Sequence, residues 1–210
     1  MTGPGWPPYP FDDSSGAADP AEWVRRQLLE RRVVGVFGPL DDRCATEVAA
    51  ALMTLDATGD SAVELHIDSA DGSVDAAMAL MDVIDLLGVP VHAWCTGRAG
   101  GPAVGVLAVC GQRVASPHAR IQLTEPQVHF DGDARSVHMQ AEEHLRRWAT
   151  FCRRLSDATG TALQRVCDDT ARGRFLSAGE AVDYGILDSV AGPDSQIIRL
   201  PGRPVGFRPH

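Results

Sequence analysis

The stretch of sequence that decides the fold is Val91–Cys110, VHAWCTGRAGGPAVGVLAVC. Its first five residues are uncharged and follow a Gly-Val-Pro run, which predicts a buried strand over Val91–Cys95. Glycines at positions 97, 100 and 101 predict a tight turn, and Pro102 suits the first position of a helix, where an N–H would be unpaired anyway. The following residues, Ala103–Val109, have no polar face, so this helix is predicted to lie inside the protein.

A strand that turns sharply into a buried helix is a place where many acyl-transfer enzymes hold their nucleophile. Backbone N–H groups on the turn then stabilise the oxyanion of the reaction. In this chain the turn carries no Ser, Cys or Thr after Thr96. Taken locally, the turn is therefore either a site that has lost its nucleophile or an ordinary start of a helix.

The flanking sequence repeats the order strand, helix, strand. Strands are predicted over residues 33–37, 62–68, 112–115 and 120–123, and helices over 21–31, about 42–58 and 74–87. Strands that alternate with helices predict an α/β fold with mostly parallel strands and right-handed crossovers.

One long helix is predicted over Ala134–Thr159, after a polar excursion from the sheet at Gln127–Asp133. An apolar seam at 4-3-4-3 spacing predicts packing against another helix. Its residues are Ala141, Leu145, Trp148, Cys152 and Leu155. A long helix of this kind suggests a protruding arm that serves association. Capping boxes are predicted at Thr161–Gln164 and Ser177–Glu180.

Length and composition predict one globular domain over residues 21–192. The Pro-rich ends predict a disordered arm over 1–20 and a mobile tail over 193–210. The net charge of −9, with no Lys at all, argues against nucleic-acid or anionic-membrane binding. The sequence shows neither an apolar run of membrane-spanning length nor a signal peptide, so a cytoplasmic protein is expected.

No cofactor or metal is expected from the sequence motifs. The glycine turn lacks both the GxGxxG spacing and the Lys of a phosphate-binding loop, so ATP is not expected to bind. The histidines show no metal-ligand spacing; His138 and His144, for example, do not share a helix face. The five cysteines are scattered and odd in number, which predicts free thiols.

Three segments together resemble the proteolytic subunit of Clp protease, from about Trp23 to Val190. They are GRAGGPAVG after a predicted strand, ARIQLTEP before the long helix, and DTARGRFLSAGEAVDYGILD at Asp169–Asp188. The last segment is the most specific, because its Arg-Phe-Leu-Ser-Ala core and Tyr-Gly ending match the family. The resemblance implies the Clp protease and crotonase-like fold, a β-α-β superhelix with a protruding handle helix. The handle would span about residues 127–159.

The family consists of serine peptidases whose rings stack into a barrel. An AAA+ unfoldase ring, driven by ATP, feeds them substrate. The resemblance therefore implies a homo- or hetero-oligomeric ring as partner and, with it, an unfoldase. Its chemistry needs a Ser nucleophile, a His base, an Asp that orients the His, and backbone oxyanion donors.

Matched position by position, most of this machinery is missing. Gly101 stands at the nucleophile position and Thr124 at the position of the base, so Asp169 is the only triad member retained. Pro102, which follows the nucleophile position, has no N–H to donate to an oxyanion. The second oxyanion turn is Ser69-Ala70-Asp71-Gly72, where Asp71 introduces a negative charge.

Loss of the nucleophile or the base alone costs about 10⁶ in turnover in a comparable triad. The sequence therefore predicts an inactive Clp-type subunit that acts through assembly with active subunits or an unfoldase. Three alternatives stay open: a homo-oligomeric scaffold, an acyl-CoA enzyme of crotonase-like chemistry, and an active serine endopeptidase with relocated residues. This last alternative would use a hydroxyl near the oxyanion turn, and the candidates there are Ser69 and Ser73.

Overall fold

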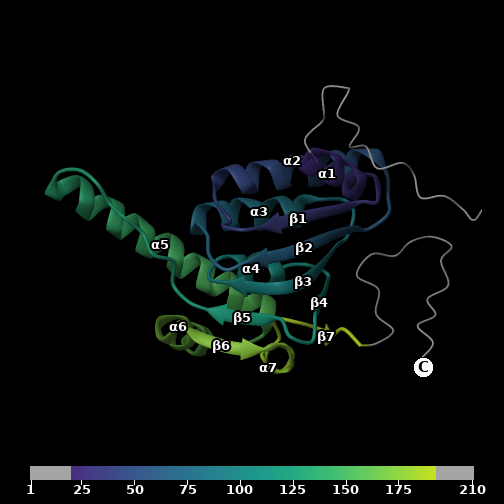
Figure 1. Cartoon of the computed structure of the whole chain (residues 1–210). Coiled ribbons are helices and arrows are strands. Elements are labelled where there is room, and N and C mark those ends of the chain that lie inside the picture. Colours follow the sequence, from purple (N-terminus) through teal and green to yellow (C-terminus); the bar gives the residue numbers. More distant parts are fainter. Residues whose placement is uncertain (1–19, 193–210) are drawn as a thin grey trace, which may run out of the picture.

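The computed structural model describes residues 20–192, and Figure 1 shows how its elements follow one another. The tail predicted for 193–210 and the arm predicted for 1–20 lie outside the described residues, apart from Pro20. Pro20 begins helix α1, Pro20–Glu30.

The strand–turn–helix unit at the centre of the sequence is formed by strand β3, Val91–Gly100, and helix α4, Ala103–Ala108. The strand continues beyond its predicted end at Cys95, because residues 98–100 pair with β5, Arg120–Leu123. Every residue of α4 is buried, as its lack of a polar face predicts. Pro102 is the N-cap of α4 and does not belong to its first turn.

The sheet is mostly parallel, with the strand order β1-β2-β3-β4-β7. The strands that flank β3 are β1 Val33–Phe37, β2 Val63–Ser69, β4 Gln112–Ala115 and β7 Ser189–Val190. Strand β5 pairs in parallel with the C-terminal half of β3. It also pairs antiparallel with β6, Arg174–Ser177. The predicted α/β class is confirmed.

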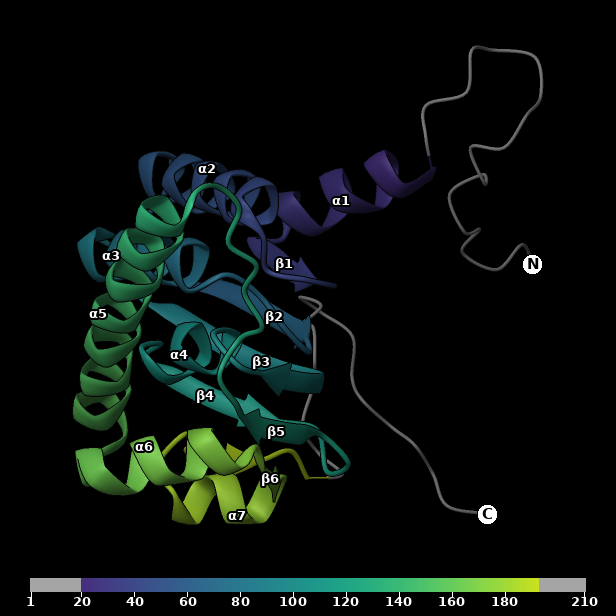
Figure 2. The same cartoon turned by 90° about the vertical axis from the view of Figure 1, so that its left-hand side faces the viewer.

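Helices cover the sheet from one side and close its lower end. In Figure 2, α2 (Asp42–Thr58) and α3 (Val74–Leu86) lie along the side of the sheet where α5 also runs. Helices α6, Leu163–Arg172, and α7, Ala178–Asp183, lie beside β6. The carboxylate of Asp41 caps α2 by accepting the N–H of Cys44 at 2.8 Å, which satisfies an end group of that helix.

Helix α5, Ala134–Thr159, has the predicted bounds, and its first half projects from the body of the protein (Figure 1). The seam prediction is correct for Trp148, Cys152 and Leu155, which are buried. Leu145, in contrast, is 65% exposed in the single chain, because the helix has left the sheet at that point. The buried half packs closely: a Cβ atom on Gly105 of α4 would lie 2.3 Å from the Phe151 ring.

The two predicted capping boxes have different outcomes. Ser177 and Glu180 form the box at the start of α7. Thr161 does not cap α6, which begins at Leu163 without a side-chain cap. Instead, the Thr161 hydroxyl donates to the carbonyl of Tyr184 at 2.8 Å and so joins the α5–α6 turn to the end of α7.

Candidate functional site

Gly101 lies at the turn between β3 and α4, with a left-handed φ of +51°. Its N–H donates to the carbonyl of Gln122 in β5 at 3.0 Å, which fixes the turn on the sheet. A Cβ atom on Gly101 would lie 3.7 Å from Cγ2 of Thr124 and 3.8 Å from Oδ1 of Asp71. Three residues singled out from the sequence therefore come together in space, although they are far apart in the chain.

The neighbouring Gly100 has a different task. A Cβ atom there would lie 2.2 Å from the backbone carbonyl oxygen of Ala70, closer than any side chain permits. The glycine thus lets the end of β3 lie directly against the turn after β2. The paired glycines are therefore not equivalent: position 100 has no room for a side chain, whereas position 101 has room for one.

Both predicted oxyanion positions are altered. Pro102 has no N–H. On the opposite turn, the N–H of Gly72 donates to Oδ1 of Asp71 at 2.7 Å. The Asp71 carboxylate therefore uses a backbone donor of this turn and places negative charge beside the Gly101 position. Such an arrangement repels a developing oxyanion, whereas acyl transfer needs donors aimed at it.

Both serines near this turn have structural partners. Ser69 is fully buried, and its hydroxyl donates to the carbonyl of Asp71 at 3.0 Å. Ser73 is the N-cap of α3 and accepts the N–H groups of Asp75 and Ala76. These contacts give both hydroxyls a structural role, so their presence at these positions needs no catalytic explanation.

Thr124 directly follows β5, at the position that the family resemblance assigns to the base. Its hydroxyl donates to the carbonyl of Glu125 at 3.3 Å. The next side chain is held firmly, because Nε1 of Trp148 donates to the Glu125 carboxylate at 3.1 Å. The contact with Trp148 of α5 thus positions the segment that carries Thr124. A threonine hydroxyl cannot accept a proton near neutral pH, so this position supplies no general base.

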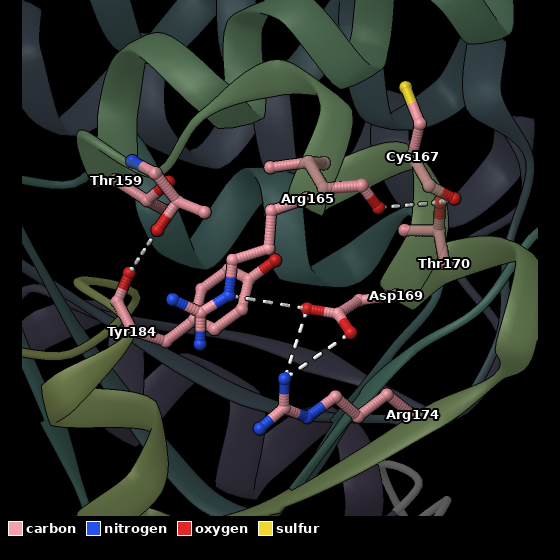
Figure 3. Close-up of polar contacts among 9 residues, drawn as sticks. Thr159, Arg165, Cys167, Asp169, Thr170, Arg174 and Tyr184 are labelled. Atoms are coloured by element: carbon pink, nitrogen blue, oxygen red, sulfur yellow. Dashed lines mark hydrogen bonds and ion pairs between the residues drawn. The ribbon is translucent and has the colours of Figure 1, made fainter.

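Asp169, which the family resemblance places at the position of the orienting Asp, is buried in α6 and held by two arginines (Figure 3). Nη1 of Arg174 lies 3.1 and 3.2 Å from the two carboxylate oxygens, and Nε of Arg165 lies 3.7 Å from one of them. The Arg165 guanidinium also lies over the Tyr184 ring, 4.9 Å from its centroid. Asp169 therefore forms an ion-pair cluster that joins α6 to β6 and α7.

Sequence reasoning missed the partners of Asp169. Arg165 lies four residues before Asp169 on the same helix, a spacing at which opposite charges meet. This ion pair could therefore have been predicted from the sequence. Arg174 comes after the left-handed C-cap Gly173 and reaches back to the helix only because β6 pairs with β5. That contact depends on the tertiary fold and has no local signal.

Replacing Asp169 by Asn is expected to lower the pKa of Tyr184. Burial is the main cause that raises the pKa of Tyr184, and the Asp169 carboxylate raises it further because negative charge disfavours the tyrosinate. We expect stability to fall by about 2 kcal/mol, because two guanidinium groups lose their partner. Absorbance titration and urea unfolding measure both effects. Tyr9 is the only other tyrosine, so a Tyr9→Phe background isolates Tyr184. An unchanged tyrosine titration would show that the Asp169 carboxylate does not act on Tyr184.

The cysteines offer no nucleophile in this region. Burial raises the pKa of Cys95, Cys110 and Cys152 to about 12 in each case, so these thiols stay protonated at neutral pH. All five cysteines are free thiols in the structure. Within residues 20–192, no three His, Cys, Asp or Glu side chains gather as metal ligands would.

The fold and this elbow define the class of protein: an α/β protein in which a parallel strand turns into a buried helix beside a second backbone turn. The Clp protease family model matches residues 17–194 of the chain. The chain therefore belongs to the Clp protease family, and its domain is that of a proteolytic subunit of this protease. Members of the family form oligomeric rings with Clp ATPases. No helix in the described part of the chain has the length and apolar character needed to cross a membrane.

Proposed function

We propose that this chain is a Clp-family subunit that hydrolyses no peptides itself and acts by assembling with peptidase-competent subunits. The observation that carries the proposal is the Asp71 carboxylate, which accepts the Gly72 N–H beside a Gly101 that has no side chain. At one place the nucleophile, the base and one oxyanion donor are absent, and Asp71 puts negative charge at the position of the other donor. Crotonase-like acyl-CoA chemistry also needs backbone oxyanion donors, so the same observation argues against it.

Assembly is supported by the projecting half of α5. Apolar side chains on this arm face solvent, with Met139 61% exposed and Leu145 65% exposed. Val128, in the segment that leads into the helix, is 43% exposed. Apolar groups spread along an arm that extends from the body are typical of a protein–protein contact surface. We infer that this arm contacts another subunit.

The first experiment measures hydrolysis of a fluorogenic peptide and labelling by a fluorophosphonate, using the purified chain alone. We expect neither signal above background. Turnover that survives Asp169→Ala but is lost with Ser69→Ala or Ser73→Ala would overturn the proposal and favour a relocated nucleophile.

The second experiment tests assembly by native mass spectrometry, with and without an active Clp subunit from the same cell. We expect mixed assemblies, and we expect Leu145→Asp to reduce them. Leu86→Asp is the matched control, because Leu86 is 85% exposed at the end of α3, away from the arm. Assemblies formed by this chain alone, with no active subunit incorporated, would favour the homo-oligomeric scaffold instead.

A further inference from the structure

Strand β1 forms one edge of the sheet and has an unused row of backbone groups. The carbonyl of Arg32 accepts the N–H of Glu64, and the N–H of Gly38 donates to the carbonyl of Asp68. In a parallel ladder, alternate residues bond to the same neighbour, so the even-numbered residues of this segment face β2. The N–H and C=O groups of Val33, Gly35 and Phe37 therefore point away from β2. Among the described residues they have no partner.

An apolar groove of about 710 Å³ runs beside this edge, between α1 and α2. Its apolar lining comes mainly from Val24, Leu28, Val34, Phe37, Val48 and Ala51. Val24 and Phe37 remain 49% and 58% exposed, so nothing among the described residues covers them fully. Arg25 and Arg43 also line the groove, with side chains 76% and 84% exposed. Both arginines pair with Glu47, and Asp41 also lines the groove, so its charges are balanced. The groove thus suits an extended apolar segment.

The chain itself supplies such a segment just before α1, in residues 8–13, Pro-Tyr-Pro-Phe-Asp-Asp. In a strand, alternate residues direct their N–H groups to opposite sides. Tyr9, Phe11 and Asp13 would carry N–H groups on one side, while the other side would hold Pro8 and Pro10, which have none. Proline is tolerated only at the outer side of an edge strand. The alternation of proline with other residues therefore suits an edge strand whose outer side carries the prolines.

We propose that residues 8–13 of the same chain add to β1 as a parallel edge strand. Only Arg31 and Arg32 separate α1 from β1, so α1 folds back and its first turn lies on the side toward which β1 points, as Figure 2 shows. Residues 14–19 then have to connect Asp13 on that side to Pro20. These six residues can span up to about 21 Å of extended chain.

This register places each group of the segment opposite a suitable partner. Phe11 donates to the carbonyl of Val33 and accepts the N–H of Gly35, which directs its ring to the Val34 side, into the apolar groove. Asp13 follows at the end of β1 where α2 begins, which brings its carboxylate toward Arg43. The prolines face outward and stop further strands from adding to the sheet, a common protection of edge strands.

The test is amide hydrogen exchange, resolved by residue with NMR, on the full chain and on matched variants. Asp13→Pro removes an N–H that faces β1, whereas Asp12→Pro removes one that faces solvent, and both make the same change of charge and composition. We expect Asp13→Pro and Phe11→Pro to speed exchange at Val33, Gly35 and Phe37 about tenfold or more, the factor of one lost hydrogen bond. Asp12→Pro should leave these rates unchanged. The amides of Val34 and Val36, bonded to β2, should not respond to any variant.

Three results would overturn the proposal. Equal rates in the wild type and in Phe11→Pro would show that the segment does not bind β1. Equal acceleration by Asp12→Pro and Asp13→Pro would show that the proposed strand pattern is wrong. Protection that disappears on dilution would assign the edge to a second copy of the chain. None of these results depends on whether the chain hydrolyses peptides, so the test is independent of the proposed function.

Discussion

Replacing Gly101 by Ser is expected to give a folded protein with no measurable peptide hydrolysis. The site has room for the side chain, since the nearest atom to a new Cβ is the Thr124 carbonyl oxygen at 3.5 Å. The left-handed φ of +51° costs about 1 kcal/mol of stability in a residue other than glycine. The neighbouring side chains are Thr124 and the Asp71 carboxylate. Neither can replace an imidazole: the threonine hydroxyl accepts no proton, and a carboxylate is too weak a base to activate a serine. Without a base the serine stays protonated and unreactive.

Activity is expected only when several positions are restored together. Thr124→His supplies the base, Asp71→Gly removes the repelling carboxylate and frees the Gly72 N–H, and Pro102→Ala restores the other donor. Each oxyanion donor is worth about 10²–10³ in turnover, but only after Ser and His are both present, because no oxyanion forms earlier. The fourfold variant should therefore be the first to react with a fluorophosphonate and to hydrolyse a fluorogenic peptide.

The control for this series carries Ala at position 101 in the same background, which keeps the backbone strain and removes the hydroxyl. Labelling of Gly101→Ser alone would show that another group acts as base, and the proposed inactivity would then be wrong. A silent fourfold variant would point to Asp169, whose carboxylate is held by Arg174 at 3.1 Å. In that case the pair with Arg174, which no local pattern indicates, would be the remaining obstacle.

The features that the sequence predicted well are those that short stretches determine. The bounds of α5 follow from one uninterrupted helical pattern between Asp133 and Gly160. The side chain of Asp133 caps the start of the helix, and the left-handed conformation of Gly160 ends it. The buried α4 follows from its lack of polar residues. The parallel order of β1, β2 and β3 follows from alternating strands and helices.

The features that were missed depend on contacts between distant segments. The second half of β3 is a strand because β5 lies beside it, and nothing in GRAG itself indicates this. The exposed Leu145 and the buried Trp148 belong to the same heptad pattern. They differ in burial because α5 extends beyond the edge of the sheet at Leu145, which the pattern itself does not reveal. Within the candidate site, the family resemblance indicates Gly101, Thr124 and Asp71, whereas no local pattern indicates the hydrogen bond from the Gly72 N–H to Asp71.

The second large effect is expected at Arg113 in β4, which joins three parts of the fold. Its Nη1 donates to the carbonyls of Gly185 at 2.9 Å and Ala108 at 3.3 Å, and its Nε donates to the Asp188 carboxylate at 3.1 Å. The side chain is only 16% exposed. The guanidinium therefore links the ends of α4 and α7 to the segment that enters β7.

Arg113→Ala is expected to lower the free energy of unfolding by about 3 kcal/mol, because buried carbonyl groups lose their donor and a carboxylate loses its partner. Arg113→Lys should recover only part of this loss, since an ammonium cannot reproduce the planar fork. Arg153→Ala, at an exposed position of α5, should change stability by less than about 0.5 kcal/mol. Urea unfolding at neutral pH measures all three variants.

The same variant should change how stability depends on pH. Hydrogen bonds from Arg113 lower the pKa of Asp188 below its ordinary value. A carboxyl group whose pKa is lower in the folded state contributes stability above its unfolded pKa, and this contribution is lost as pH falls through the folded value. The wild type should therefore lose more stability than Arg113→Ala between neutral pH and about pH 3, because Arg113→Ala has already lost the side-chain part of this contribution at neutral pH. The backbone N–H of residue 113, which donates to Asp188 at 2.8 Å, remains in the variant. Parallel pH profiles for the two proteins would show that Asp188 gains nothing from Arg113, and the stability loss would then belong to the carbonyl contacts alone.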